Sequence, residues 1–317
     1  MTVEEQEAFY PNLAQHIRGA RKTGGGFYGI SPEKSIFNAT PEERDQLWSR
    51  LAAAGGFALS VNNYREAAMD LEANRLVYDW WRQQVHKRMK NKEKAELMAP
   101  KEPMYPIYTK RPPLEQDLYE MIDRDNVELV NLLENPIEAF DASGIKTKDG
   151  VHRNHDIIAL ATGFDSYSGT MTRMGLKNTD GKDLKECWQK GVWSYLGLMV
   201  HGFPNMFMVY SPHAPTPIAN GPTIIEAQVE TIAAYIKSLE AQGVKSLEPT
   251  HEAEIEWKKT INDMYDTTLV KNTDSWWNAG NIPGKQKEAL IFLGGVEMYE
   301  NILLDKLDGF KGFIVKM

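Results

Sequence analysis

Apolar residues recur at helical spacing in the first third of the chain. One face of the helix predicted around residues 76–89 carries Leu76, Val77, Trp80, Trp81, Val85 and Met89. A second helix is predicted over residues 41–54, because Thr40 can cap its first turn and Gly55-Gly56 ends it. Residues 1–105 show no convincing strand pattern, so we predict a helical region there.

From about residue 105, short β-rich runs replace the helical pattern. The predicted strands cover residues 127–130, 137–140, 145–147, 156–161 and 206–209. Asp149-Gly150 is a favourable hairpin turn between two of them. Residues 157–161 are apolar without interruption, as expected of a strand buried on both faces of a parallel sheet. A long amphipathic helix is predicted over residues 222–239, and this strand–loop–helix order is typical of α/β folds.

Length, charge and cysteine content narrow the class of protein. A chain of 317 residues allows about two domains. The 36 basic and 44 acidic residues give a net charge of −8, which argues against nucleic acid or an anionic membrane as the partner. Cys187 is the single cysteine, so no internal disulfide can form. Without a signal-like start or an 18-residue apolar run, we expect a cytoplasmic protein.

The glycines at 24, 26 and 29 match the G-x-G-x-x-G pattern of dinucleotide-binding loops. That pattern requires a buried strand before it and a helix after it. Charged residues precede Gly24, and Ser31-Pro32 follows Gly29 at once. We therefore predict a flexible loop here, and no phosphate site.

Two other motifs, one for a metal and one for a nucleophile, give only weak signals. His152 and His155, with Asp156, have a spacing that can bind a metal, but no further ligand cluster accompanies them, so no metal is predicted. The sequence contains no G-x-S-x-G motif, and Cys187 has no partner pattern, so nucleophilic hydrolase chemistry has no support.

More specific segments occur in a fixed order along the chain. They are Thr109-Lys110-Arg111-Pro112, the run D-I-I-A-L-A-T-G-F-D over residues 156–165, Gly202-Phe203-Pro204-Asn205, Asn220-Gly221-Pro222-Thr223, Ser275-Trp276-Trp277 and Asn281-Ile282-Pro283-Gly284-Lys285. Together and in this order they resemble the second half of Baeyer–Villiger monooxygenases. These are flavin-dependent, NADPH-using enzymes that convert ketones to esters or lactones. The resemblance is dense from about residue 100 onward and weaker over the helical first hundred.

The resemblance implies an α/β fold with incomplete FAD- and NADP-binding Rossmann-like domains and an N-terminal all-helical insert. Residues 1–104 are then the helical insert, 105–164 the C-terminal part of the NADP-binding domain, and 165–317 the C-terminal part of the FAD-binding domain. Both glycine-rich fingerprints of the family and its F-x-G-x-x-x-H-x-x-x-W signature are missing. We therefore expect a chain that lacks the N-terminal half and has little or no activity alone.

The resemblance also implies the site residues and the cofactors, FAD and NADPH. Arg111 matches the family's active-site arginine, whose fixed charge stabilises a negatively charged tetrahedral intermediate formed from a small-molecule ketone. The implied cofactor-binding residues are Lys110, Thr162, Gly163, Asn220, Gly221, Pro222 and Trp276. Asn220-Gly221-Pro222 also suits a helix start, whose positive end would face the flavin.

Two alternatives remain at this point. The chain could be a non-catalytic family-derived subunit that pairs with a full-length relative, or an enzyme such as an isomerase that uses the remaining cavity. The first alternative draws on the strands that the missing FAD segment would leave without neighbours. The sequence also departs from the family pattern at two positions. Ser211 stands where glycine is usual, and His213 stands where glutamine or asparagine is common, so a side chain could crowd the flavin.

Overall fold

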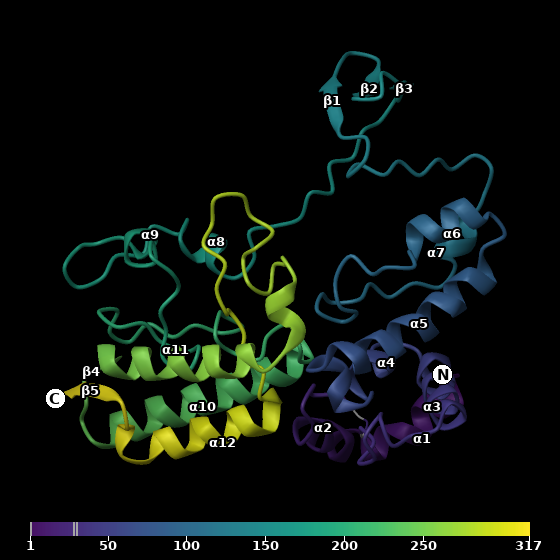
Figure 1. Ribbon diagram of the computed structural model, residues 1–317. Coiled ribbons are helices and arrows are strands. Elements are labelled where there is room, and N and C mark those ends of the chain that lie inside the picture. The colour runs from purple at the N-terminus through teal and green to yellow at the C-terminus, as the bar shows by residue number, and fades with distance from the viewer. Residues whose placement is uncertain (1, 28, 30) are drawn as a thin grey trace.

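The computed structural model describes residues 2–27, 29 and 31–317 and contains three regions in chain order (Figure 1). A group of helices forms the N-terminal region. An extended stretch of chain then leads out to a small three-stranded sheet and returns. The C-terminal region is built around three long helices that lie side by side, with irregular loops above them.

The N-terminal region is helical, as the sequence predicts. Its helices are α1 (Val3–Phe9), α2 (Leu13–Arg21), α3 (Pro41–Ala54), α4 (Ala58–Val61), α5 (Leu71–Arg88), α6 (Lys92–Met98) and α7 (Leu118–Ile122), with 3-10 turns at Tyr10–Asn12 and Arg65–Ala68. The bounds predicted for α3 are confirmed. The Thr40 hydroxyl accepts from the Glu43 N–H at 3.2 Å, the Glu43 carboxylate accepts from the Thr40 N–H at 2.8 Å, and Gly55 ends the helix at φ +72°.

Helix α5 organises this region through its apolar face and one buried amide. Val77 and Ala73 are fully buried, and Trp80 packs against Trp48 of α3 with ring centroids 5.9 Å apart. The Asn74 amide donates to the carbonyls of Ala67 at 2.7 Å and Ile107 at 3.0 Å, and its oxygen accepts from the Ile107 N–H at 2.9 Å. Asn74 thereby fixes the chain just before Lys110 and Arg111.

The three-stranded sheet confirms the predicted strands at 137–140 and 145–147 and the turn after the second of them, while its third strand was not predicted. Strands β1 (Ile137–Phe140), β2 (Gly144–Thr147) and β3 (His152–Asn154) pair antiparallel in that order. Asp149-Gly150 lies in the turn between β2 and β3, with Gly150 at φ +84°.

Three other predicted strands are not found as paired strands. Residues 127–130, 156–161 and 206–209 join no ladder. The run expected to be most buried is instead exposed, with Ile157 at 85% and Leu160 at 70%. A strand forms only where a neighbouring backbone accepts and donates its hydrogen bonds, and none lies beside residues 156–161 in the described chain.

The C-terminal region packs three long helices around aromatic residues. Its elements are α8 (Ser168–Met171), α9 (Leu184–Cys187), α10 (Gly221–Ala241), β4 (Ser246–Pro249), α11 (His251–Asp266), a 3-10 turn at Leu269–Asn272, α12 (Gly295–Leu307), a 3-10 turn at Asp308–Phe310 and β5 (Phe313–Lys316). Strands β4 and β5 pair antiparallel. Trp257 stacks on Phe292 with centroids 5.3 Å apart, and Tyr235 and Tyr299 are fully buried. The predicted helix over 222–239 is confirmed as α10.

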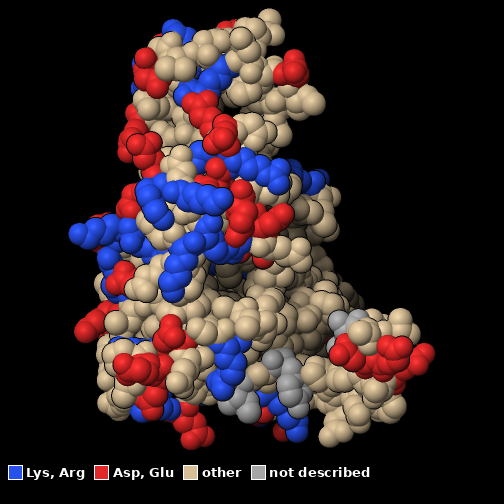
Figure 2. Space-filling model, turned by 90° about the vertical axis from the view of Figure 1, so that its right-hand side faces the viewer, with Lys and Arg blue, Asp and Glu red and all other residues tan. Residues whose placement is uncertain are grey.

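The charged surface over the helical region mixes both signs. Figure 2, viewed from the right-hand side of Figure 1, shows basic side chains in a band interrupted by acidic ones. Arg82 pairs with Glu96, and Arg88 pairs with Glu115 and Glu120, each within 2.7 Å. In the described part of the chain, no helix combines the length and apolar character needed to cross a membrane.

Replacing Asn74 by alanine is expected to destabilise the chain by about 3 kcal/mol, because the substitution leaves buried backbone groups of Ala67 and Ile107 without partners. Urea unfolding at pH 7 measures this change. Gln83→Ala, on the exposed face of the same helix, is the control and should fall within about 0.5 kcal/mol of the unaltered chain. Equal stability of the two variants would contradict this role of Asn74.

Candidate functional site

Two adjacent cations, Lys110 and Arg111, are held without an acidic partner. The Arg111 guanidinium lies 4.8 Å from the ring centroid of Phe57, and Lys110 Nζ lies 4.4 Å from that of Tyr105. Such contacts stabilise a cation without neutralising its charge. Among the described residues, neither forms an ion pair with a carboxylate. Both charges therefore remain available to an anion or to a negatively charged oxygen.

A buried contact between distant segments holds these cations next to the C-terminal region. The hydroxyls of Thr109 and Thr273 are 2.6 Å apart, and both residues are almost fully buried. The pKa of Asp274 is lowered mainly by Lys287 and also by the charge of Lys110. Lys110 therefore lies close to the segment that carries Trp276. The structure thus joins the segment of Lys110 and Arg111 to the segment that carries Trp276.

Tyr167 connects Trp276 to the loop that precedes α10. Its ring lies 5.5 Å from that of Trp276, at an angle of 33°. Its backbone has φ +60° and ψ −77°, and the Ser168 N–H donates to the Ser166 carbonyl at 2.8 Å across it, which forms a strained γ-turn. Burial raises the pKa of the Tyr167 phenol, while Thr216 and Arg111 oppose that effect.

The loop of residues 210–220 is buried and closely hydrogen-bonded. The Tyr210 hydroxyl donates to the Thr216 carbonyl at 2.9 Å. The Ser211 hydroxyl donates to the Gly197 carbonyl and is buried, so the side chain expected to crowd the flavin points into the protein. His213 is fully buried at φ +66°, and its Nδ1 lies 3.0 Å from the Ser194 hydroxyl oxygen.

Asn220, Gly221 and Pro222 form the start of α10. The Asn220 side chain makes no capping hydrogen bond, and the first turn of the helix contains no acidic residue. The Tyr210 ring lies within about 4 Å of where a side chain at Gly221 would begin. The first turn therefore keeps its positive end free of protein anions.

Thr162 and Gly163 lie apart from this group, on the exposed stretch that follows the unpaired run. The residues just after them contact the loop that carries Asn281 and Lys285. The Asn281 side chain donates to the Phe164 carbonyl at 3.2 Å, and Lys285 donates to the Ser168 hydroxyl at 2.8 Å and pairs with Asp165. The structure thus brings into contact two of the segments that carry the family resemblance, D-I-I-A-L-A-T-G-F-D and Asn281-Ile282-Pro283-Gly284-Lys285.

Sequence reasoning missed Tyr167, Tyr210 and Thr216. The hydroxyl of Tyr167 is buried without a hydrogen-bond partner among the described residues, because Thr216 beside it lacks hydrogen-bond geometry. The only signal for Tyr167 was its place two residues after the A-T-G-F-D run. No local pattern marks Tyr210 or Thr216.

The weak metal and nucleophile motifs do not form sites. His152 Nε2 lies 2.8 Å from a carboxylate oxygen of Asp141, on the small sheet. In the described part of the chain, no group of three or more histidine, cysteine or acidic side chains is arranged to hold a metal ion. Cys187 closes α9, and burial raises its pKa.

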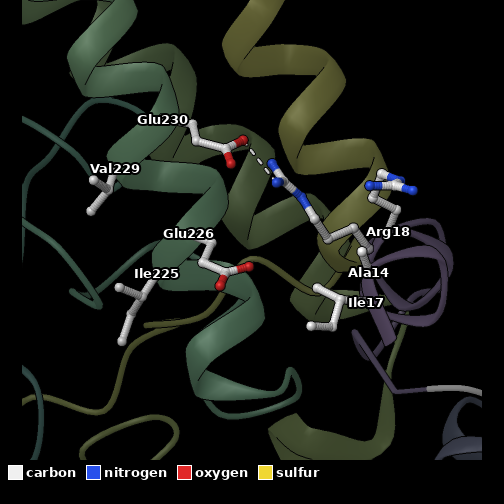
Figure 3. A pocket seen from close by; sticks show the side chains of 8 residues that line it. Ala14, Ile17, Arg18, Ile225, Glu226, Val229 and Glu230 are labelled. Carbon is white, nitrogen blue, oxygen red and sulfur yellow. Dashed lines mark ion pairs between the residues drawn. The ribbon is translucent and has the colours of Figure 1, made fainter. Parts of the chain in front are cut away.

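A surface hollow lies elsewhere, between α2 and α10, with a volume of about 680 Å³. Figure 3 shows Ala14 and Ile17 of α2 facing Glu226 and Glu230 of α10. Glu230 forms an ion pair with Arg21 of α2. None of the site residues named above lines it.

The glycine-rich segment near this hollow is not a dinucleotide-binding loop. Helix α2 precedes it where a strand would be required. The expectation of a flexible loop is wrong for Gly24 and Gly25. The Gly24 carbonyl accepts from the Val296 N–H at 3.0 Å, and the Gly25 carbonyl accepts from the Asn220 N–H at 2.8 Å.

Comparison with known proteins gives relatives for nearly the whole chain, although no family model matches it. The chain is 36% identical to the FAD-binding monooxygenase acrE of Aspergillus aculeatus, over 99% of the chain and 53% of that protein. It is 32% identical to cyclopentanone 1,2-monooxygenase of a Comamonas species, over 99% and 57%. The NADP+-bound cyclohexanone monooxygenase of Rhodococcus superposes with a TM-score of 0.93 at 32% identity, over 100% and 59%.

The fold is thus a mixed α/β arrangement with a large helical component, similar to that of a cyclohexanone monooxygenase and a steroid monooxygenase. The chain is a homologue of FAD-binding Baeyer–Villiger monooxygenases and corresponds to the C-terminal portion of their sequence. It spans between 53% and 59% of the length of the relatives described above.

His213 provides a pH test of the buried loop. Burial, followed by the charge of Lys258, lowers the pKa of His213 to about 3. In the unfolded chain a histidine has a pKa of about 6.5. Between these two pKa values the unfolded chain binds more protons than the folded chain. The free energy of unfolding therefore falls as the pH is lowered from about 6.5, by up to about 1.4 kcal/mol per pH unit.

Replacing His213 by glutamine should remove this contribution. We expect the difference in stability between the unaltered chain and His213→Gln to grow in favour of the variant as pH falls from 7 to 5. Urea unfolding at the two pH values measures it. Because Glu254, whose pKa is raised by burial, is present in both proteins, its opposite contribution cancels. A pH-independent difference would show that His213 is not held neutral.

Proposed function

We propose that this chain forms the C-terminal part of an FAD- and NADPH-dependent monooxygenase that converts small-molecule ketones to esters or lactones. One observation carries the proposal. Among the described residues Lys110 and Arg111 form no ion pair with a carboxylate, and the buried contact between Thr109 and Thr273 joins their segment to that of Trp276. The relatives that carry Baeyer–Villiger and cyclopentanone monooxygenase names align with the chain throughout this arrangement.

The start of α10 fits a flavin. Its first turn has no side-chain cap and no acidic residue, which suits the electron-rich edge of an FAD ring system. FAD would be held there by Asn220, Gly221 and Pro222. Once residues 156–161 are packed in a sheet, FAD and NADPH would also be contacted by Thr162 and Gly163. When bound, FAD supplies oxygen activation and NADPH supplies the hydride.

Lys110 and Trp276 fit NADPH. The unpaired ammonium group of Lys110 suits the negatively charged phosphate and ribose region of the nucleotide. The half-buried Trp276 presents an indole ring that can lie against a ribose. Because Thr273 anchors one segment to Thr109 of the other, both contacts would form on a single rigid unit.

Arg111 would act on the reacting oxygen. Addition to a ketone carbonyl places negative charge on its oxygen, and a guanidinium fixed beside that atom lowers the barrier electrostatically. Phe57 orients the guanidinium through its ring face and leaves the nitrogen donors without a competing carboxylate. Arg111 is therefore the residue that we assign to catalysis.

The domain division follows the same proposal. We assign residues 1–104 to a helical insert, 105–164 to the NADP-binding domain and 165–317 to the FAD-binding domain. We place the protein in the cytoplasm, where Cys187 stays reduced.

The unpaired strands support a partner segment equivalent to the N-terminal half of the relatives. Residues 156–161 expose apolar side chains and backbone groups that a parallel sheet would cover. Adding that segment, in the same polypeptide or as a separate one, would supply the missing neighbours. Without it, we expect little flavin binding and little activity.

The proposal is tested by co-expressing this chain with the N-terminal half of a relative such as the acrE monooxygenase. The expected result is a complex that binds FAD and oxidises NADPH in step with ester formation from a cyclic ketone. The chain alone should be colourless. A complex that forms but binds no flavin would contradict the proposal and favour a non-catalytic subunit.

Arg111→Ala in the same complex should lower the turnover of ketone about 100- to 1000-fold, because the reacting oxygen loses its fixed cation. Flavin content should be unchanged. Arg173→Ala removes an exposed arginine away from the site and is the control. Equal turnover of the two variants would show that Arg111 does not act in catalysis.

A further inference from the structure

The segment of residues 21–27, called here the strap, connects helix α2 to two parts of the candidate site. Its turn is closed by the Thr23 hydroxyl, which lies 2.7 Å from both the Ala20 and the Phe27 carbonyl oxygens. It contains the glycines that resemble a phosphate loop, although helix α2 precedes it. Its contacts show a different use for these glycines.

The backbone of the strap holds the first turn of α10. The Asn220 N–H donates to the Gly25 carbonyl at 2.8 Å, and the Thr223 hydroxyl donates to the Gly26 carbonyl at 3.3 Å. Gly26 is buried at φ +64°, and a Cβ atom there would meet the Thr223 side chain at 3.1 Å. The uncapped start of α10 is thus fixed by a segment about 200 residues earlier in the chain.

One arginine secures the strap to the rest of the C-terminal helices. Arg21 pairs with Glu230 of α10 at 2.7 Å and also with Glu300 of α12, and its side chain is mostly buried. Figure 3 shows the ion pair with Glu230 crossing from α2 to α10. Arg21 thus adds an ion pair with each helix to the backbone contacts of the strap.

The far end of the strap reaches the catalytic cation. The Phe27 ring packs on the Phe57 ring with centroids 5.6 Å apart, and Phe57 in turn lies under the Arg111 guanidinium at 4.8 Å. A short segment therefore touches the supports of both Asn220 and Arg111.

We propose that the strap is a positioning element, which sets the start of α10 relative to Arg111 by backbone contacts that only glycine permits at position 26. This inference rests on the proposed function, which places FAD at that helix start. The strap acts through Asn220, Thr223 and Phe57.

Amide hydrogen exchange on the chain alone, compared between Gly26→Ala and Gly24→Ala, tests the inference. A methyl group at Gly24 meets nothing within 4 Å, so the control should exchange as the unaltered chain does. In Gly26→Ala, the hydrogen-bonded amides of Asn220 and Ile224 should exchange about tenfold faster, while the amides of α11 are unchanged. Equal exchange in the two variants would overturn the inference.

Thr223→Val covers the case in which Gly26→Ala does not fold. It keeps the size of the side chain and removes the hydroxyl that donates to Gly26. Faster exchange of the Asn220 and Ile224 amides is expected, and exchange unchanged from that of the unaltered chain would overturn the proposal.

The complex with the N-terminal half separates this inference from the proposed function. There, Gly26→Ala should weaken FAD binding about tenfold relative to Gly24→Ala, with the visible flavin spectrum shifted. If the unaltered complex binds no FAD, the proposed function fails and the exchange measurement still decides the inference. If FAD binds equally to both variants, the strap does not position the cofactor helix.

Discussion

A strand buried in a sheet needs neighbouring strands, and this requirement governs the structure. Residues 157–161 are apolar on every side chain, yet the described chain supplies no strand to pair with them, and Ile157 and Leu160 are exposed. The backbone on both edges of this run keeps unused donors and acceptors. Three features follow from this lack of neighbouring strands. They are the exposed position of Thr162 and Gly163, the small number of paired strands and the proposed need for a partner segment.

Elements set by neighbouring residues could be predicted from the sequence. Helix α3 begins and ends where Thr40 and Gly55 place its caps, and Asp149-Gly150 forms the predicted turn, because these signals act within a few residues. The run at 156–161 has equally clear strand character but depends on a partner far away or outside the chain. Its sequence therefore predicts a strand that the structure does not pair.

The candidate site divides in the same way. Lys110, Arg111 and Trp276 could be nominated from their motifs, but the contact that joins them, between Thr109 and Thr273, links positions 164 residues apart and leaves no local signature. The glycines at 24 and 26 gave a misleading pattern for the same reason. Gly26 packs on Thr223 and the Gly24 carbonyl accepts from the Val296 N–H, and no spacing near these glycines reveals either contact.

Amide hydrogen exchange of residues 156–161, measured for the chain alone and in complex with the N-terminal half of a relative, tests the central claim most directly. We expect fast exchange in the chain alone and strong protection in the complex, because partner strands would then use these amides. Strong protection in the monomeric chain alone, or fast exchange in a stable complex, would contradict the claim that this run is an unpaired strand awaiting its neighbours.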